Sequence, residues 1–197
     1  GRLALHFDKK GVLELPGLAP LGVKQPFSVG AWFYLPKGEE SFTIVSMQDP
    51  KQKGRGWSFQ VSGRVPGVRF YGVEGKSIEI RAGHLDQLTP GTWNHAAFSY
   101  DGTGEALGVR VFMNGVEART QRKATAKVEG DFANSGPLRL GNPGKAFDPG
   151  GAIADLRVVE GVVGAEQARL LMLWPAIEEA SGKQPVELTL EEREGFR

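Results

Sequence analysis

The chain contains no cysteine. Disulfides, thiolate metal sites, cysteine nucleophiles and the Cys-x-x-Cys-His haem attachment motif are therefore excluded within these 197 residues. The compartment stays open on this evidence, because many periplasmic domains also lack cysteine.

The sequence also lacks long hydrophobic runs and any excess of one charge. Lys and Arg number 24 and Asp and Glu number 23, so the formal net charge is +1. This balance indicates neither a nucleic-acid partner nor an anionic membrane surface. The apolar runs are far too short to span a bilayer, so we expect no membrane insertion by this chain.

Short alternating segments separated by turn residues fill most of the sequence, which has 28 Gly and 12 Pro. This pattern predicts an all-β, two-sheet antiparallel jelly-roll sandwich with short C-terminal helices. Residues 3–7 read as a first strand and 11–15 as its hairpin partner. Further strands are predicted over 27–35, 42–47, 56–62, 67–73, 77–82, 92–100, 109–113, 116–118, 138–140 and 151–158. Asn114-Gly115 is a strong signal for a two-residue hairpin turn.

Helix is predicted only near the end of the chain. Residues 164–171 read as a short helix, and Pro175 is expected to break the pattern. We predict a domain over residues 1–174, followed over 175–197 by a linker and the start of another helix. That second helix is expected at Thr189, which has the capping-box spacing to Glu192.

Several phrases in a fixed order resemble the laminin G-like, concanavalin A-like jelly-roll superfamily. The matching pieces are Phe27-Ser28-Val29-Gly30-Ala31-Trp32, Gly91 to Gly102 with its Trp93-Asn94-His95, Val111 to Gly115, Pro137 to Asn142 and Gly151 to Val158. Within that superfamily the chain looks like the module of large bacterial proteins that also carry cytochrome and cytochrome-associated domains. The resemblance implies an excised module of an exported, periplasmic or extracellular protein whose signal and haem both lie outside this chain.

Catalysis is not expected. Retaining glycosidases need two carboxylates about 5–5.5 Å apart, and neither Glu39-Glu40 nor Glu74 with Glu79 puts two on one strand face. The three histidines lack both helical i, i+4 spacing and a His-x-His pair, which disfavours a zinc site. The family phrase assigns His95 a structural role. No Gly-x-Ser-x-Gly elbow supports a serine hydrolase, although a dispersed triad cannot be read from sequence.

Calcium is the more plausible metal, because relatives hold Ca²⁺ at the sandwich rim with acidic side chains and carbonyl oxygens. The resemblance carries these positions onto Asp8 and Asp155. One usual acid is replaced by Ala154, and Lys9 and Lys10 oppose a cation. The alternative is that Asp8 is a turn residue and Asp155 pairs with a basic side chain.

Carbohydrate binding requires an exposed aromatic ring with polar neighbours. We expect Trp32 and Trp93 in the core, Trp57 under the rim and Trp174 at the base of the sandwich, which leaves Tyr71 and Phe112 facing out. The strand phases predict one polar face, whose ligand-binding candidates are Gln60, Arg69, Tyr71 and Arg81, with Phe112 as the second aromatic. The alternative is an ordinary solvated sheet face.

The sequence therefore predicts a non-catalytic module that binds a polysaccharide or glycoconjugate. The alternative is a structural domain that docks the neighbouring domains of its parent protein. A basic cluster (Arg119, Arg122, Lys123 and Lys127) fits either a sulfated-glycan patch or a solvated turn.

Overall fold

The computed structural model describes residues 3–7, 11–16, 19–73, 77–83, 87–122, 126–141 and 151–181. Within them the elements are β1 (Leu5–Phe7), β2 (Val12–Leu15), β3 (Phe27–Tyr34), β4 (Phe42–Asp49), η1 (Pro50–Gln52), β5 (Arg55–Ser62), β6 (Val65–Tyr71), β7 (Ser77–Ala82), β8 (Trp93–Tyr100), η3 (Ala106–Gly108), β9 (Val109–Met113), β10 (Val116–Glu117), β11 (Thr120–Gln121), β12 (Leu138–Gly141), β13 (Gly151–Glu160) and α1 (Ala165–Ser181). No helix in this part of the chain is long and apolar enough to cross a bilayer.

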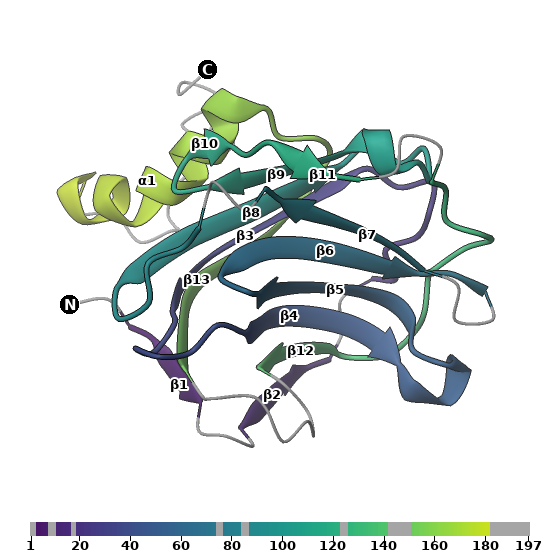
Figure 1. The fold of residues 1–197 in the computed structure, drawn as a ribbon, viewed down its shortest axis with the longest axis horizontal. Coiled ribbons are helices and arrows are strands. Elements are labelled where there is room, and N and C mark those ends of the chain that lie inside the picture. Colours follow the sequence, from purple (N-terminus) through teal and green to yellow (C-terminus); the bar gives the residue numbers. More distant parts are fainter. Residues whose placement is uncertain are drawn as a thin grey trace.

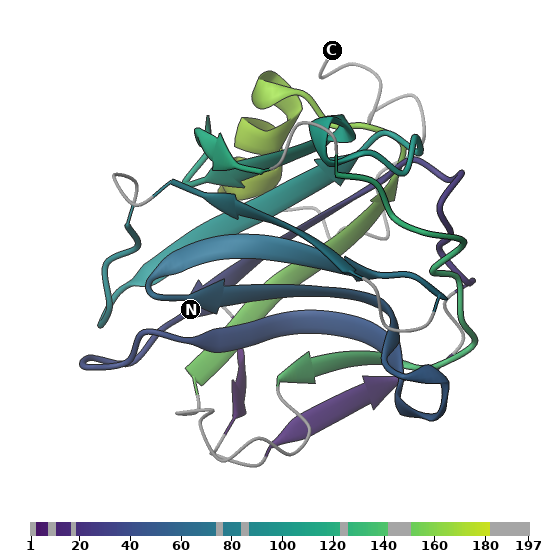
Figure 2. The same ribbon diagram turned by 45° about the vertical axis from the view of Figure 1, so that its right-hand side comes forward.

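The strands form two antiparallel sheets packed face to face (Figure 1). Sheet A has the order β1-β13-β3-β8-β9-β10, and sheet B has the order β11-β7-β6-β5-β4-β12-β2. Figure 2 shows β4 to β7 of sheet B arching across the front of the molecule, with β3, β8 and β13 of sheet A behind them. The predicted jelly-roll sandwich is confirmed.

The core between the sheets follows from the period-two alternation of the strands. In β3 the inward positions are Phe27, Val29, Ala31 and Phe33, all buried. Phe98 of β8 lies at the centre, with its ring centroid 5.6 Å from that of Phe27 and 5.1 Å from that of Phe59. Edge-to-face packing of this kind adds to the burial energy of the rings.

The two N-terminal strands do not form the predicted hairpin. Strand β1 pairs with β13 in sheet A, whereas β2 pairs with β12 in sheet B. The chain therefore crosses from one sheet to the other between them. The prediction was wrong because strand pairing depends on tertiary partners, and alternation within a strand does not identify those partners.

Helix α1 runs through Pro175, which was expected to end it, and continues to Ser181. The predicted linker is therefore helical over its first residues, while Thr189 lies outside the described residues. Pro175 removes one intrahelical hydrogen bond, but packing against sheet A anchors the helix before it. There the indole N–H of Trp32 donates to the carbonyl oxygen of Met172 at 3.0 Å.

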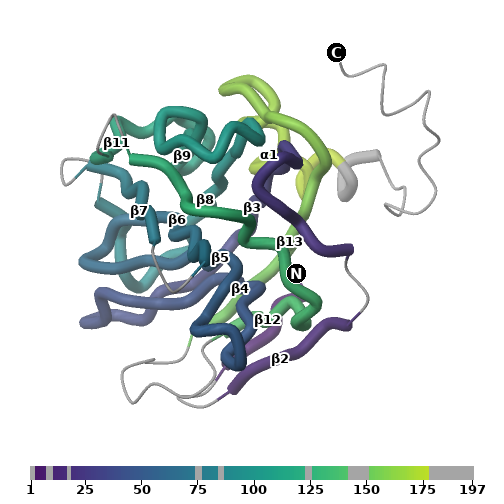
Figure 3. Tube along the Cα trace, turned by 90° about the vertical axis from the view of Figure 1, so that its right-hand side faces the viewer, coloured from purple at the N-terminus to yellow at the C-terminus, as the bar shows by residue number. Residues whose placement is uncertain are grey.

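The helix covers the outer face of sheet A. Figure 3 shows α1 on the far side of sheet A from the β4–β7 layer. Phe112 and Ala97 of the sheet form a small second core with Val163, Ala168 and Leu171. The helix covers only part of this face, and among the described residues no α-helix lies over the outer face of sheet B.

The hydroxyl of Tyr100 links two loops at one end of the sandwich. It donates to the carbonyl oxygen of Val23 and accepts from the N–H of Gly104 at 2.7 Å. Burial raises the pKa of Tyr100 to about 12, helped by the negative charges of Asp101 and Asp131 and opposed by the Gly104 hydrogen bond.

We expect this raised pKa to make the fold sensitive to alkali. The stabilisation is complete below pH 10, the ordinary tyrosine pKa, and is lost between pH 10 and about 12, because the unfolded state releases its proton first. Urea unfolding should lose on the order of 2–3 kcal/mol across that window. Tyr100→Phe should show a shallower slope there, and parallel slopes for the two proteins would contradict the assignment.

Candidate functional site on sheet B

Four of the five predicted ligand residues share the outer face of sheet B. Arg69 of β6 lies directly opposite Glu79 of β7, and Gly67 lies between Gln60 and Arg81. Tyr71 is two residues from Arg69 and therefore on the same face. The strand phases thus placed Gln60, Arg69, Tyr71 and Arg81 together, as expected.

Arg69 is the centre of this group. Its Nη2 lies 2.5 Å from Oε2 of Glu79, its Nη1 donates to the hydroxyl of Tyr71 at 3.4 Å, and its guanidinium carbon is 5.8 Å from the centre of the Tyr71 ring. Burial lowers the pKa of Arg69, but the bonds to Glu79 and Tyr71 outweigh it and hold that pKa above its ordinary value. Arg69 is therefore a permanent cation braced against an aromatic ring.

Arg81 closes one side of the group. Its Nε lies 3.9 Å from Oε1 of Glu79, and its Nη2 donates to the carbonyl oxygen of Ser62 in the β5–β6 turn. Both arginines thus share one carboxylate, which fixes their side chains against the sheet and leaves the pair with a net positive charge.

A longer polar row crosses the whole sheet. Directly opposed residues on its outer face run Glu79, Arg69, Ser58, Ser46, Arg139 and Glu14, from β7 to β2. We call these six residues the polar row. An arginine–glutamate pair stands at each end, since Nε of Arg139 donates to Glu14 at 2.7 Å. Glu14, Ser46, Ser58 and Arg139 were not predicted as site residues. Glu14 and Arg139 could not be inferred, because β2 and β12 lie far from β6 in the sequence.

Two adjacent members of this row, Ser58 and Arg69, each have a buried polar atom with no hydrogen-bond partner among the described residues. Ser58 is only 3% exposed, and its atom is the hydroxyl oxygen. In Arg69, the residue directly opposite, the atom is Nε. Buried polar groups are nearly always satisfied, so neighbouring orphans on an outer face indicate a position where a water or ligand hydroxyl belongs.

Phe112 was predicted to face solvent, but it does not. It is on the outer face of its strand but is fully buried, because α1 lies over it. It therefore has no open ring face for a sugar, and it belongs to the opposite sheet from Tyr71. Strand phase indicated correctly that it points away from the main core, but the helix that covers it could not be inferred from that pattern.

The tryptophans are distributed differently from the prediction. Trp57 is fully buried in the core. Trp93 is 37% exposed on the outer face of sheet A, with its ring centroid 6.0 Å from that of Tyr34. Trp32 is also on that face, beside His95. The signal was available: Trp93 is out of phase with Ala96, Phe98 and Tyr100, which point into the core between the sheets, so Trp93 points outwards.

Asp155 forms an ion pair with Arg157. This is the role that the sequence offered as the alternative to a calcium ligand. Their charged groups are 2.8 Å apart, and Asp155 sits in a bulge of β13 with φ of 49°. Asp8 lies outside the described residues. Phe7, which precedes it, pairs with Gly151, four strand positions or roughly 13 Å from Asp155. Calcium binding at Asp8 and Asp155 stays a prediction, and the described residues contain no cluster of three or more potential metal ligands.

The basic cluster is partly paired. Nζ of Lys127 lies 3.9 Å from Glu105, and the side chain of Arg122 donates to that of Thr120. Lys123 lies outside the described residues. Because Lys127 lies close to a carboxylate and Arg122 is hydrogen-bonded within the loop, the basic cluster is a weaker anion site than its four charges suggest.

The carboxylates of the polar row are poorly placed for glycoside hydrolysis. Glu79 and Glu14 are at its two ends, five strand spacings or roughly 24 Å apart. Each is paired with an arginine. The two-carboxylate chemistry of glycosidases requires a separation below about 10 Å, so this pair cannot perform it.

Comparisons with known proteins agree with this architecture. The family model of the concanavalin A-like lectin/glucanases superfamily matches residues 7–169. No curated protein matches the sequence. Among solved structures, the binding domain of Paraclostridial Mosquitocidal Protein 1 is similar with a TM-score of 0.68 and 10% identity, over 87% of this chain and 43% of that one.

Two further structures have the same fold. The receptor binding domain of botulinum neurotoxin D matches with a TM-score of 0.63 and 12% identity, over 89% of this chain and 44% of that one. A heptameric SAP-like pentraxin from Limulus polyphemus matches with a TM-score of 0.56 and 17% identity, over 84% of this chain and 83% of that one. The chain thus spans less than half the length of the toxin domains, and these identities establish only the fold.

Proposed function

Because the chain belongs to the concanavalin A-like lectin/glucanases superfamily, we propose that it is a non-catalytic carbohydrate-binding module that holds a polysaccharide on the outer face of sheet B. We further propose that its parent is an exported bacterial protein with other domains. The observation that carries the binding proposal is the polar row with two adjacent atoms, Ser58 Oγ and Arg69 Nε, that have no hydrogen-bond partner in the described part of the chain.

The proposed mechanism uses each side chain for one task. The half-buried ring of Tyr71 provides a surface for the C–H groups of a sugar ring. Arg69, Arg81 and Gln60 donate to sugar hydroxyls, and the ion pairs with Glu79 hold the two arginines in position. Such preorganisation lowers the entropy lost when a flexible glycan binds.

The relatives support a binding role at a coarser level. The two toxin structures are described as binding or receptor binding domains, and for this chain we propose the same kind of task with a glycan as the ligand. The alternative, a module that docks neighbouring domains, uses the same open face and differs only in the partner.

The test is retention of the purified module by a panel of neutral, acidic and sulfated polysaccharides. We expect one class to be retained and Tyr71→Ala to weaken its binding about fivefold to tenfold, since one aromatic contact contributes about 1–1.5 kcal/mol. Gln60→Ala should weaken it less, because it removes a neutral hydrogen bond worth about 1 kcal/mol.

The matched control is Trp93→Ala, which removes an exposed aromatic residue from the other sheet. It should leave retention unchanged. If Trp93→Ala abolishes retention and Tyr71→Ala does not, the glycan binds on sheet A and our assignment is wrong. No retention by any polysaccharide would favour the docking alternative.

A further inference from the structure

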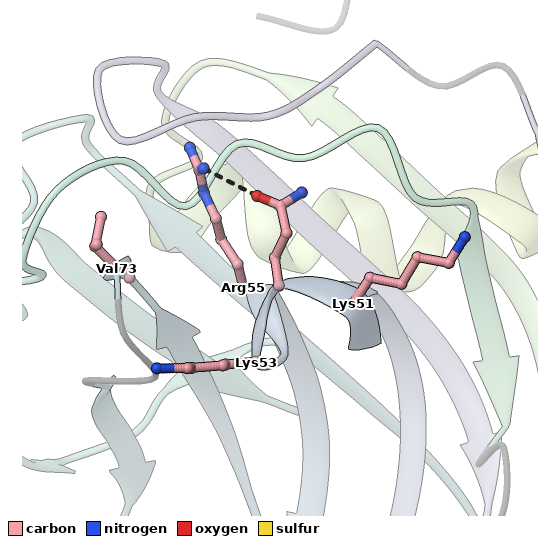
Figure 4. Close-up of a pocket in the computed structure, with 6 residues that line it drawn as sticks. Lys51, Lys53, Arg55 and Val73 are labelled. Carbon is pink, nitrogen blue, oxygen red and sulfur yellow. Dashed lines mark hydrogen bonds between the residues drawn. The ribbon is translucent and has the colours of Figure 1, made fainter.

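A cavity of about 260 Å³ lies at one end of the central strands of sheet B, where β5 begins and β6 ends (Figure 4). Its lining residues are Lys51, Gln52, Lys53, Arg55, Gly72 and Val73. We call it the rim pocket. Three of the six lining side chains are cationic and none is acidic, so the lining repels cations and attracts anions.

A tight turn brings these cations together. The 3₁₀ turn η1 begins after Asp49, whose carboxylate accepts the N–H of Lys51 at 2.9 Å. Lys53 then adopts a left-handed conformation with φ of 56°, and Arg55 starts β5. In Figure 4 the side chains of Lys51 and Lys53 extend to opposite sides. This separation is expected, because like charges repel each other.

The guanidinium of Arg55 is incompletely bonded. One nitrogen, Nη1, donates to Oε1 of Gln52 at 3.2 Å, while the buried Nε has no hydrogen-bond partner among the residues that the structure describes. A buried, unpaired donor on a charged group is costly. An anion in the pocket would supply the missing acceptor.

Nearby carboxylates do not neutralise the pocket by direct pairing. Among the described residues, Lys51, Lys53 and Arg55 form no ion pair within 4.0 Å. The side chain of Asp49 is occupied by the Lys51 N–H and the amide of Gln52. That of Asp131, which the charge of Arg55 influences, accepts from two backbone N–H groups.

We infer that the rim pocket is a binding site for a compact oxyanion, such as a sulfate, a phosphate or a carboxylate group. Arg55 donates to it, and Lys51 and Lys53 turn inwards to complete its coordination. The site differs from the polar row in its residues and its ligand. Tyr71 and Gly72 are consecutive, however, so a glycan on the polar face could place a charged substituent in the pocket, an extension that rests on the proposed function.

The first experiment titrates the full chain with sodium sulfate and with sodium phosphate, at an ionic strength held constant with chloride, and follows backbone amide shifts by NMR. We expect saturable shifts centred on Lys53, Gly54 and Gly72. Arg55→Gln should weaken binding about tenfold, because it removes a charged donor whose hydrogen bonds to an anion are stronger than those of a neutral amide. Lys53→Asn, which keeps a residue suited to the left-handed conformation, should also weaken it.

Matched controls remove the same charges at the other end of the sandwich. Arg64→Gln and Lys37→Asn make the same side-chain changes beside the β5–β6 and β3–β4 connections. They should leave the titration unchanged. If the amides of the pocket do not shift saturably, or if all four variants behave alike, the proposal is overturned and the attraction is only the general charge of the surface.

The second experiment compares dextran sulfate with neutral dextran. If dextran sulfate binds more tightly, and Arg55→Gln abolishes that advantage, the oxyanion is carried by a glycan. If sulfate ions bind but the two polymers do not differ, the ligand is a free anion. Retention of neutral polysaccharides without any binding of sulfate or phosphate would uphold the proposed function and refute the pocket.

Discussion

Replacing Gly56 by alanine should lower the free energy of unfolding by about 3–5 kcal/mol, which combines backbone strain and overpacking. Gly56 has φ of 137°, a backbone conformation that residues other than glycine rarely adopt. A Cβ atom there would lie 1.9 Å from the carbonyl oxygen of Met47 and 2.7 Å from Nδ2 of Asn134. That amide nitrogen donates to the carbonyl oxygens of both Met47 and Arg55, so the clash also displaces the Asn134 side chain that bridges β4 and β5.

The measurement is equilibrium urea unfolding, with Gly38→Ala as the matched control. Gly38 also has a positive φ, 84°, but a Cβ there meets nothing within 4 Å. Gly38→Ala should therefore lower the free energy of unfolding by only about 1 kcal/mol, from conformational strain alone. Equal losses for the two variants would show that the close approach at Gly56 is relieved by small shifts of β4.

Phe98→Ala should also cost about 3–5 kcal/mol, by leaving a cavity in the centre of the sandwich. The ring of Phe98 is fully buried and lies within 6.1 Å, between ring centroids, of Phe27, Trp57, Phe59 and Phe70. These neighbours come from β3, β5 and β6, so the residue connects both sheets. Because hydrogen bonds to neighbouring strands fix the backbone of β3, β5, β6 and β8, these strands cannot move inwards far enough to fill the cavity.

Two variants bracket this effect. Phe98→Leu, which retains most of the apolar volume, should cost clearly less than Phe98→Ala. Leu107→Ala, at a side chain that is 52% exposed, should change stability by less than about 0.5 kcal/mol. A loss at Phe98→Ala no larger than at Leu107→Ala would mean that Phe98 is not the centre of the core.

Much of the architecture was predictable because the pleat of a strand repeats every two residues. The alternation in 27–35 and 77–82 gave strands whose observed bounds, Phe27–Tyr34 and Ser77–Ala82, differ by at most one residue. It also placed Arg69 and Tyr71 on one outer face, which the sheet register confirms. The bounds of a strand and the face of each of its side chains are local properties, so they can be predicted from the residues of that strand and its two flanking turns.

Most of what failed was non-local, and Trp93 is the exception. Trp93 was assigned to the core from a family phrase although its strand phase points outwards, and Phe112 was expected in solvent although a helix covers it. The partners of β1 and β2 in different sheets, and the contribution of Arg139 to the polar row, depend on contacts between distant segments. No pattern within either strand reveals which strand lies beside it.

The sequence by itself determined the class of fold, the phase of each long strand and the family, because these follow from local alternation, turn residues and motif order. Only the tertiary structure decided which sheet face stays open, which side chains cross six strands to form the polar row, and where Arg55 meets Gly72 to enclose the rim pocket. The physical reason is that pairing and covering are decided by the burial of surfaces far apart in the chain, whereas alternation is decided by the backbone of a single strand.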